Sequence, residues 1–368
     1  MESLVDHELF DGIYKGRKVF VTGHTGFKGT WLVSWLTMLG ADVTGYSFES
    51  DENTRHYALL KPRVNSVKGD IRDHKKITDT VLGAEPEIVF HLAAQPLVRR
   101  SYKDPVATYH TNVMGTLNLY EACRRSQSVK AIVSVTSDKV YENKEALIAY
   151  RESDVLGGYD MYSSSKACVE LMTNSYRKSF FNAEGSEHTK GLVTARAGNV
   201  IGGGDWAEDR LIPDIMRAIE GRTKLFVRSP NAVRPWQHVL EPLSGYLLLG
   251  QRLFANRNFE SASLNFGPSA KDYVTVAQLL EKIKKTVSDL QYEFDPRALN
   301  FHEAGILTVD SSLAKQILGW SPLWDVETSV ARTARWYDQF INHGILLTYD
   351  DIIAYVREAI QRKTVWTS

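Results

Sequence analysis

One short segment constrains the fold of this chain more than any other. Residues 18–22 form an apolar run that ends in the glycine cluster Gly23-His-Thr-Gly-Phe-Lys-Gly29, and apolar residues then recur with helical spacing over 31–39. This order predicts a strand, a tight turn and a helix. Glycines let the backbone turn sharply and approach a pyrophosphate, and the helix N-terminus faces its negative charge. The segment therefore predicts a dinucleotide-binding site.

Further apolar runs alternate with segments of helix length, at 42–46, 64–68, 88–92, 130–136 and 192–196. This alternation predicts an α/β fold, with a Rossmann-type doubly wound parallel sheet. Beyond Gly202 the regularity weakens, up to an amphipathic segment at 326–340. We expect a smaller, interleaved C-terminal substrate domain. The dinucleotide-binding domain is expected to comprise residues 1–198 and, later in the chain, residues 236–262. The nucleotide-sugar-binding domain is expected to comprise residues 199–235 and 263–368.

The composition excludes several other classes of protein. Lys plus Arg and Asp plus Glu both number 44 among the 368 residues, so no overall field attracts nucleic acid or an anionic membrane. Cys123 and Cys168, the two cysteines, lack the spacing of metal ligands, and we expect neither a metal site nor a disulfide. We find no signal-peptide pattern and no apolar run long enough to span a membrane. We expect a soluble, uncleaved, cytoplasmic protein.

A Tyr-x-x-x-Lys spacing occurs three times, but only Tyr162 and Lys166 lie in a sustained helical pattern that follows the fifth predicted strand. Residues four apart share one face of a helix. A phenol has a pKa of about 10, and it must fall by roughly 3 units for the group to act as a base near neutrality. We expect the Lys166 ammonium and a positive nicotinamide ring to lower the pKa of Tyr162.

The fifth predicted strand ends in Thr136-Ser-Asp-Lys139. Ligands bind at the carboxyl ends of parallel strands. Ser137 can donate a hydrogen bond to a substrate oxygen, while Asp138 and Lys139 place an acid and an amine beside the same substrate. With Tyr162 and Lys166, these three residues form the predicted catalytic set.

The residues after the second strand leave NAD and NADP both open. Ser47 stands where an acid would bind the adenosine ribose, Glu49 lies about 20 residues past the loop and could serve, and Lys28 could bind a 2′-phosphate. After the third strand, Asp70 and Ile71 suit an adenine contact.

Longer motifs resemble the extended short-chain dehydrogenases that act on nucleotide sugars, and among them the CDP-glucose branch of the 4,6-dehydratases. The resemblance runs from 15 to about 337. Its motifs lie at 21–29, 91–99, 136–139, 150–152, 157–160, 196–206 and 234–239. Lys139 is the most diagnostic residue, because most sugar-nucleotide 4,6-dehydratases carry Glu there and the CDP-glucose branch carries Lys.

The resemblance implies a hydro-lyase with tightly bound NAD, in which hydride moves from C4 to C6 of the sugar as water is lost. Tyr162 would take the O4 proton, Lys139 would act as base at C5, and a protonated Asp138 would donate to the departing hydroxyl. Burial and the neighbouring Lys166 charge would lower the pKa of Lys139. The implied cofactor-binding residues are Gly23, Thr25, Gly26, Phe27, Gly29, Ser47, Asp70, Ile71, Leu92, Ala93, Ala94, Gln95, Tyr162 and Lys166. The implied substrate-binding residues are Gln95, Asn199, Arg210, Arg234 and Asn265.

The same resemblance implies a homodimer that packs through helices at 112–124 and 162–178, and a pathway toward deoxysugars of a cell-surface polysaccharide such as a lipopolysaccharide O-antigen. Glu241 we interpret as a structural partner. Departures from the family pattern, at Val140, Ala146, Ala149 and Met161, leave the exact sugar open. The alternative functions are another hexose or heptose 4,6-dehydratase or a 4-epimerase. A non-catalytic dinucleotide sensor would be expected to lose Tyr162, Lys166 or Ser137.

Overall fold

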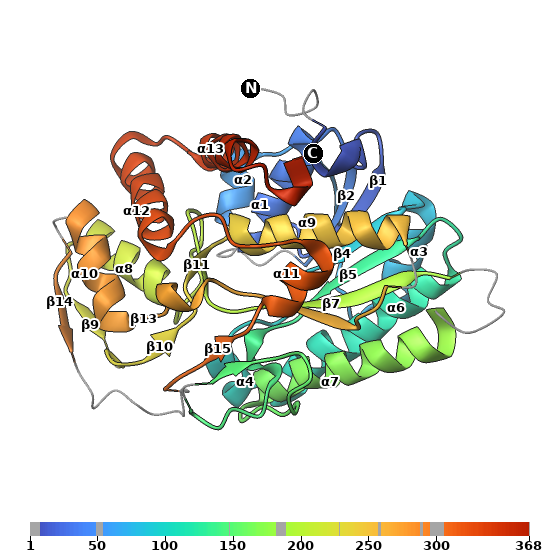
Figure 1. Ribbon diagram of the computed structural model, residues 1–368, viewed down its shortest axis with the longest axis horizontal. Coiled ribbons are helices and arrows are strands. Elements are labelled where there is room, and N and C mark those ends of the chain that lie inside the picture. The colour runs from blue at the N-terminus through green and yellow to red at the C-terminus, as the bar shows by residue number, and fades with distance from the viewer. Residues whose placement is uncertain are drawn as a thin grey trace.

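The structure is a computed structural model that describes residues 8–48, 54–146, 148–181, 189–227, 229–256, 259–287, 290–294 and 305–367. Within these ranges the centre of the molecule is a seven-stranded parallel sheet (Figure 1). In spatial order its strands are β12 (Ser263–Phe266), β7 (Gly191–Ala197), β5 (Ala131–Val135), β4 (Ile88–His91), β1 (Lys18–Thr22), β2 (Asp42–Ser47) and β3 (Asn65–Lys68). The predicted doubly wound α/β fold is confirmed.

The inner strands β1, β4, β5 and β7 are apolar or buried on both faces because each face is covered by helices, whereas the edge strand β3 is largely exposed. Along β1, for example, Val19 and Val21 belong to one hydrophobic core, while Phe20 between them belongs to the other. The first core packs under α1 (Phe27–Met38), α9 (Leu240–Ala255) and α13 (Thr348–Gln361). The second packs under α3 (His74–Ala84), α6 (Gly115–Arg125) and α7 (Met161–Tyr176).

Short helical pieces connect the strands on the N-terminal side of the chain. They are α2 (Arg55–Leu60), α4 (Val98–Lys103), α5 (Pro105–Tyr109) and a π-helical turn at His110–Met114 that joins α5 to α6.

The smaller region lies at one end of the sheet and consists of helices and short strand pairs (Figure 1). Its helices are α8 (Leu211–Glu220), α10 (Val276–Thr286) and α12 (Val326–His343), while α11 (Ser312–Leu318) packs against β12 and α9 of the larger region. The strand pairs are β9 (Leu225–Val227) with β14 (Tyr292–Phe294), β10 (Val233–Arg234) with β13 (Val274–Thr275), β8 (Val200–Ile201) with β11 (Gln237–His238), and β6 (Ala149–Tyr150) with β15 (Thr308–Val309).

Two features depart from the organisation expected from the sequence. Residues 263–266, assigned there to the smaller domain, form β12 and pair with β7 in the central sheet. Residues 263–266 therefore belong with the dinucleotide-binding domain and not with the smaller domain. The sequence analysis also overlooks α13, which follows the predicted amphipathic helix α12 and packs against α1.

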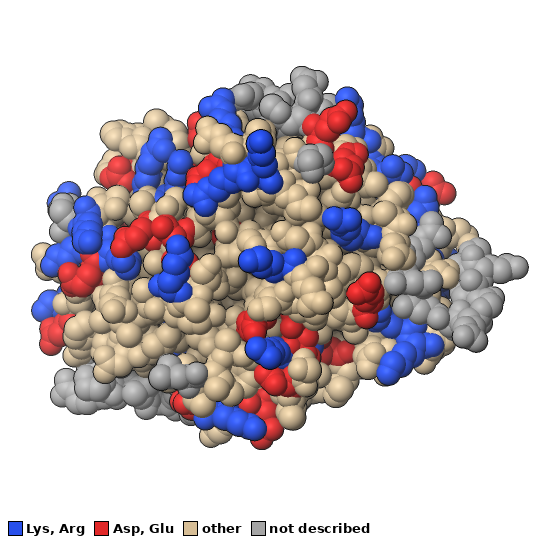
Figure 2. All heavy atoms as spheres, in the orientation of Figure 1, with Lys and Arg blue, Asp and Glu red and all other residues tan. Residues whose placement is uncertain are grey.

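Positive and negative side chains are interspersed over the face shown in Figure 2, in keeping with the balanced charge of the sequence. In the described part of the chain no helix is long and apolar enough to cross a membrane. The same residues contain no group of His, Cys, Asp and Glu side chains that could hold a metal ion.

Candidate active site

A cavity of about 1240 Å³ opens at the carboxyl ends of the strands, and residues that follow β1 and β4 both line it. The sheet order reverses between these two strands, which is where doubly wound sheets bind ligands. All predicted site residues except Asn265 line this one cavity: Gly23, Thr25, Gly26, Phe27, Gly29, Ser47, Asp70, Ile71, Leu92, Ala93, Ala94, Gln95, Ser137, Asp138, Lys139, Tyr162, Lys166, Asn199, Arg210 and Arg234.

The glycine turn between β1 and α1 is packed too closely for side chains. Gly23 has a φ of +73°, and a Cβ there would lie 2.8 Å from the backbone nitrogen of Ala93. A Cβ on Gly29 would clash with the Gly23 carbonyl oxygen. Gly26 is the N-cap of α1, so the helix N-terminus borders the cavity. These residues fit the diphosphate of a dinucleotide, which needs close backbone approach and a helix N-terminus.

The predicted adenosine end of the cavity contains Ser47 and Asp70. The Ser47 hydroxyl accepts a hydrogen bond from the Thr25 amide at 3.3 Å and lies 2.9 Å from His24 Nδ1. Asp70 forms an ion pair with Arg72 at 2.5 Å. Glu49, one of the two residues considered for the ribose, lies outside the described residues.

The predicted catalytic pair is carried by α7, which begins where the Asp160 carboxylate caps the Ser163 amide at 2.9 Å. Lys166 Nζ donates to the Val135 carbonyl at 3.1 Å, at the end of β5. Burial lowers the pKa of Lys166 to about 8, and the charge of Glu170 opposes this shift.

The pKa of Tyr162 differs from the expected one. Burial raises it to about 12 and the Asp138 and Asp160 charges act in the same direction, while a hydrogen bond with Ser137 and the Arg210 charge only partly oppose this effect. Desolvation of the phenolate therefore outweighs the surrounding protein charges. Contrary to the expectation from the sequence, Lys166 is not among the groups that shift this pKa, so a fall requires further positive charge, as a nicotinamide ring would supply.

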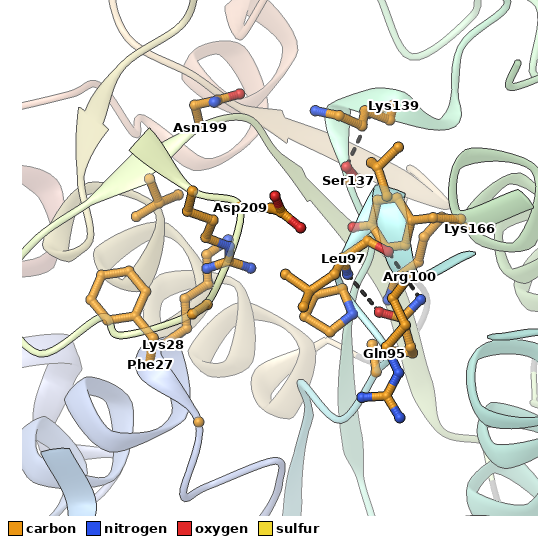
Figure 3. A pocket seen from close by; sticks show the side chains of 18 of the residues that line it. Phe27, Lys28, Gln95, Leu97, Arg100, Ser137, Lys139, Lys166, Asn199 and Asp209 are labelled. Atoms are coloured by element: carbon orange, nitrogen blue, oxygen red, sulfur yellow. Dashed lines mark hydrogen bonds between the residues drawn. The ribbon is translucent and has the colours of Figure 1, made fainter. Parts of the chain in front are cut away.

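Ser137, Asp138 and Lys139 are held together at the end of β5. The Ser137 hydroxyl donates to Asp138 Oδ1 at 3.1 Å and accepts from the Lys139 amide at 3.2 Å (Figure 3). Lys139 Nζ lies 3.7 Å from Asp138 Oδ1, and 29% of the Lys139 side chain is exposed. The sequence analysis expected a buried amine and a neutral acid, whereas these groups lie at ion-pair distance with the amine partly in solvent.

The second carboxylate oxygen, Asp138 Oδ2, is buried and has no hydrogen-bond partner within the described residues. Buried polar atoms are usually paired, so an atom of this kind marks a place where a ligand group can bind. The unpaired Asp138 Oδ2 therefore indicates that the cavity can bind a polar ligand.

Gln95 follows β4 and is positioned by Asn112, a residue that the sequence analysis did not assign to the site. Asn112 Oδ1 accepts from the Gln95 amide at 2.8 Å, and Asn112 Nδ2 donates to Ser165 Oγ at 2.9 Å. Asn112 lies in the π-helical turn, a local irregularity that is frequent at functional sites. An asparagine inside a helical pattern is the sequence signal that could have revealed it.

Asn199, Arg210 and Arg234 reach the cavity from the loop side. Arg210 pairs with Asp205 at 3.1 Å, while Arg234 Nη1 donates to the Val233 carbonyl at 3.0 Å.

Asn265 corrects the predicted substrate-binding set. Its side chain is fully buried: Nδ2 donates to the carbonyls of Tyr150 and Asp310, and Oδ1 accepts from the Tyr141 hydroxyl at 2.7 Å. Because these bonds occupy both ends of the amide, Asn265 ties β12 to the β6–β15 pair instead of facing a ligand. The sequence analysis missed this role because it did not recognise β12.

A sequence profile of the family described as GDP-mannose 4,6 dehydratase matches residues 20–333. The chain belongs to this family. Among curated proteins, the chain is 46% identical over 336 residues to CDP-glucose 4,6-dehydratase of Salmonella typhimurium, a match that covers 89% of this chain and 92% of that protein. It is 24% identical to a UDP-glucose 4-epimerase of Mycoplasma pneumoniae, over 88% of this chain and 98% of that protein.

Solved structures agree with this membership at the level of the fold. A UDP-glucose 4-epimerase from Stenotrophomonas maltophila with bound NAD superposes with a TM-score of 0.76 at 22% identity, over 88% of this chain and 98% of that chain. A dTDP-glucose 4,6-dehydratase from Bacillus anthracis in complex with NAD gives a TM-score of 0.72 at 20% identity, over 89% and 98%. The family match and the 46% identity confirm the predicted resemblance to extended short-chain dehydrogenases that act on nucleotide sugars.

Proposed function

We propose that this dehydratase-family chain is a CDP-glucose 4,6-dehydratase, a hydro-lyase that forms CDP-4-keto-6-deoxyglucose with tightly bound NAD. The observation that carries the proposal is the Asp138–Lys139 pair at the cavity, in a chain 46% identical to a CDP-glucose 4,6-dehydratase. Tyr162, Lys166 and Ser137 line the same cavity, which argues against a non-catalytic dinucleotide sensor.

NAD held by the glycine turn would supply the redox chemistry, carrying a hydride from C4 to C6 of the hexose within one turnover. Tyr162 accepts the proton from the sugar O4, and Lys166 stabilises the phenolate while its amine is protonated. The ketone at C4 acidifies the C5 proton, which the neutral amine of Lys139 removes and returns to C5 when hydride adds to C6. Asp138 protonates the hydroxyl that leaves C6, and Ser137 hydrogen-bonds the oxygen at C4.

Gln95, Asn199, Arg210 and Arg234 are the side chains we assign to the nucleotide sugar. Arginines suit a diphosphate because the guanidinium binds two oxygens at once. Arg210 directly precedes α8 and Arg234 lies in β10, so both approach the cavity from elements of the smaller region.

The test is incubation of the purified protein with CDP-, dTDP-, GDP- and UDP-glucose, with mass spectrometry of the products. We expect loss of one water from CDP-glucose alone. A product of unchanged mass but altered C4 configuration would instead assign the chain as a 4-epimerase. Loss of water from a CDP-heptose, with CDP-glucose left intact, would assign a different sugar to the same reaction.

We further propose a homodimer formed through the helices at 112–124 and 162–178, which are the π-helical turn with α6 and α7, together with the neighbouring α5. Large apolar side chains are exposed on these elements, among them Val106 at 65%, Met114 at 46% and Leu171 at 60%. A second copy of the chain would remove them from water. Leu171→Glu is expected to convert a dimer to a monomer in analytical ultracentrifugation, and a wild-type monomer would contradict this proposal.

We place the reaction in the cytoplasm, in keeping with the free thiols of Cys123 and Cys168. The product would supply deoxysugars for a cell-surface polysaccharide, such as a lipopolysaccharide O-antigen. Detection of the product among soluble sugar nucleotides of the cell would test this role.

A further inference from the structure

Lys28 is the second helical residue of α1, directly after the glycine turn, and its side chain lines the cavity. The charges that act on its ammonium are those of Arg210, Asp138 and Lys166, which belong to the substrate and catalytic side of the cavity. Figure 3 shows Phe27 and Lys28 across the cavity from Ser137, Lys139 and Lys166. Lys28 therefore does not lie with Ser47 and Asp70, where a 2′-phosphate of NADP would be expected.

Three other cations on the substrate and catalytic side of the cavity have partners in the protein. Arg210 pairs with Asp205, Lys139 lies 3.7 Å from Asp138, and Lys166 donates to the Val135 carbonyl. Lys28 forms no hydrogen bond or ion pair with any described residue, and its ammonium lies 5.9 Å from the centre of the Tyr246 ring.

This arrangement is unfavourable for the protein alone. Burial and the repulsion of Arg210 lower the pKa of Lys28 to about 7. Lys28 is half-buried at the wall of the cavity, so its ammonium loses part of its hydration without gaining a counter-ion, and a second cation nearby adds to the cost. Both costs are removed when an anion binds between the two cations.

We propose that Lys28 binds a phosphate oxygen of a diphosphate that enters this cavity. A lysine ammonium is a compact charge that suits a phosphate oxygen, and the adjacent N-terminus of α1 favours the same ligand. The cavity receives two molecules with this group under the proposed function, the dinucleotide and the nucleotide sugar, and the inference rests on that function.

Proton uptake gives a signature that a purely structural lysine would not show. At pH 8 an amine with a pKa of about 7 is mostly neutral. A phosphate beside it raises the pKa, so binding takes up close to one proton per site. Calorimetric titrations in two buffers of different ionisation enthalpy measure this uptake.

The experiment uses wild type, Lys28→Met and Lys28→Arg, with two separate titrations at pH 8. NAD+ is titrated into protein freed of dinucleotide, and CDP is titrated into protein saturated with NAD+. For the ligand that Lys28 contacts, Lys28→Met is expected to weaken binding by about tenfold to 100-fold. Lys28→Arg should keep most of the affinity but lose proton uptake, because its guanidinium is always charged.

The titration in which affinity and uptake are lost identifies the source of the phosphate. Equal affinity of wild type and Lys28→Met for both ligands would overturn the inference while leaving the proposed function intact. A wild type that binds neither ligand would overturn both. Lys75→Met, at an exposed lysine of α3, is the matched control and should change neither titration. Thermal unfolding of Lys28→Met should occur at or above the wild-type temperature, which separates loss of binding from loss of folding.

Discussion

Glu170 and Glu241 are buried glutamates on two helices that pack against opposite faces of the central sheet, and their partners differ in charge. The Glu170 carboxylate accepts hydrogen bonds from the Arg196 guanidinium at 2.7 Å and from the hydroxyls of Thr136 and Thr194. Among the described residues, the donors to the Glu241 carboxylate are all neutral. These are the backbone amides of Leu323 and Trp324, at 2.8 and 2.7 Å, and the Tyr355 hydroxyl at 2.9 Å.

The difference separates a region that supports catalysis from one that joins parts of the fold. Glu170 lies one helical turn from Lys166, and its partner Thr136 directly precedes Ser137, so this ion pair holds the catalytic side of the cavity in place. Glu241 connects α9 to α13 through Tyr355, as the sequence analysis expected of a structural partner. Burial raises the pKa of Glu241 to about 7, because no cation compensates it. Changes near Glu170 should therefore alter activity, and changes near Glu241 should alter stability.

The largest effect is expected for Tyr162→Phe, on the catalytic side of this comparison. Removing the hydroxyl that accepts the O4 proton should lower kcat by about 10² to 10⁴-fold while the fold is kept. Tyr355→Phe is the matched control beside Glu241, and it should leave kcat unchanged while lowering the unfolding temperature. Water loss from CDP-glucose, followed by mass spectrometry, measures both variants. Near wild-type turnover in Tyr162→Phe would remove the phenol from the mechanism.

Arg196→Met should be the most destabilising change of the two regions. It leaves the Glu170 carboxylate buried without its cation, and breaking a buried pair in this way costs about 3–5 kcal/mol. Urea unfolding of the purified protein measures the loss. The double variant Glu170→Gln with Arg196→Met should recover part of it, since no charge then remains buried. A loss below about 1 kcal/mol in the single variant would mean that the pair is not desolvated.

Residues that follow predicted strands were placed well from the sequence, because parallel strands bring their carboxyl ends to one edge of the sheet. Ser137, Gln95 and the glycine turn all reach the cavity for this reason. The strands themselves were recognised because both faces are covered, which produces short apolar runs. Tyr162 was distinguished from two other Tyr-x-x-x-Lys matches by its place in a helix after the fifth strand.

Predictions failed where a side chain depends on contacts distant in sequence. Asn265 lies in a four-residue strand whose pairing with β7 joins residues far apart in the chain, and no local pattern shows this. By contrast, α13 carries a recognisable helical spacing of Ile352, Tyr355, Val356 and Ala359, all of which are buried.

The pH dependence of stability should distinguish the Glu241 region. The folded pKa of about 7 lies above the ordinary value of 4.5, so Glu241 favours the folded state when protonated. That contribution is complete below pH 4.5 and is lost as the pH rises to 7, a change of about 3 kcal/mol. The free energies of unfolding of wild type and Glu241→Gln are compared from pH 5 to 8. As the pH rises, wild type should lose stability relative to Glu241→Gln, because glutamine does not titrate. A constant difference would contradict a buried, uncompensated carboxylate. Burial also raises the pKa of Asp351 to about 7. Because Asp351 is present in both proteins, its contribution to the free energy of unfolding cancels in the comparison.

The smallest effect, and the sharpest contrast between the two glutamates, is expected in the pH dependence of catalysis. The Glu170 carboxylate favours the protonated form of Lys166, whose pKa is about 8. Glu170→Gln keeps an acceptor for Thr136 but removes this charge, so Lys166 should lose its proton at lower pH. The alkaline limb of the kcat profile with CDP-glucose should then move down by up to about one pH unit. Glu241→Gln, at an equally buried position, should leave the profile in place. If both variants moved the limb equally, or neither did, the distinction between a catalytic and a structural carboxylate would not hold.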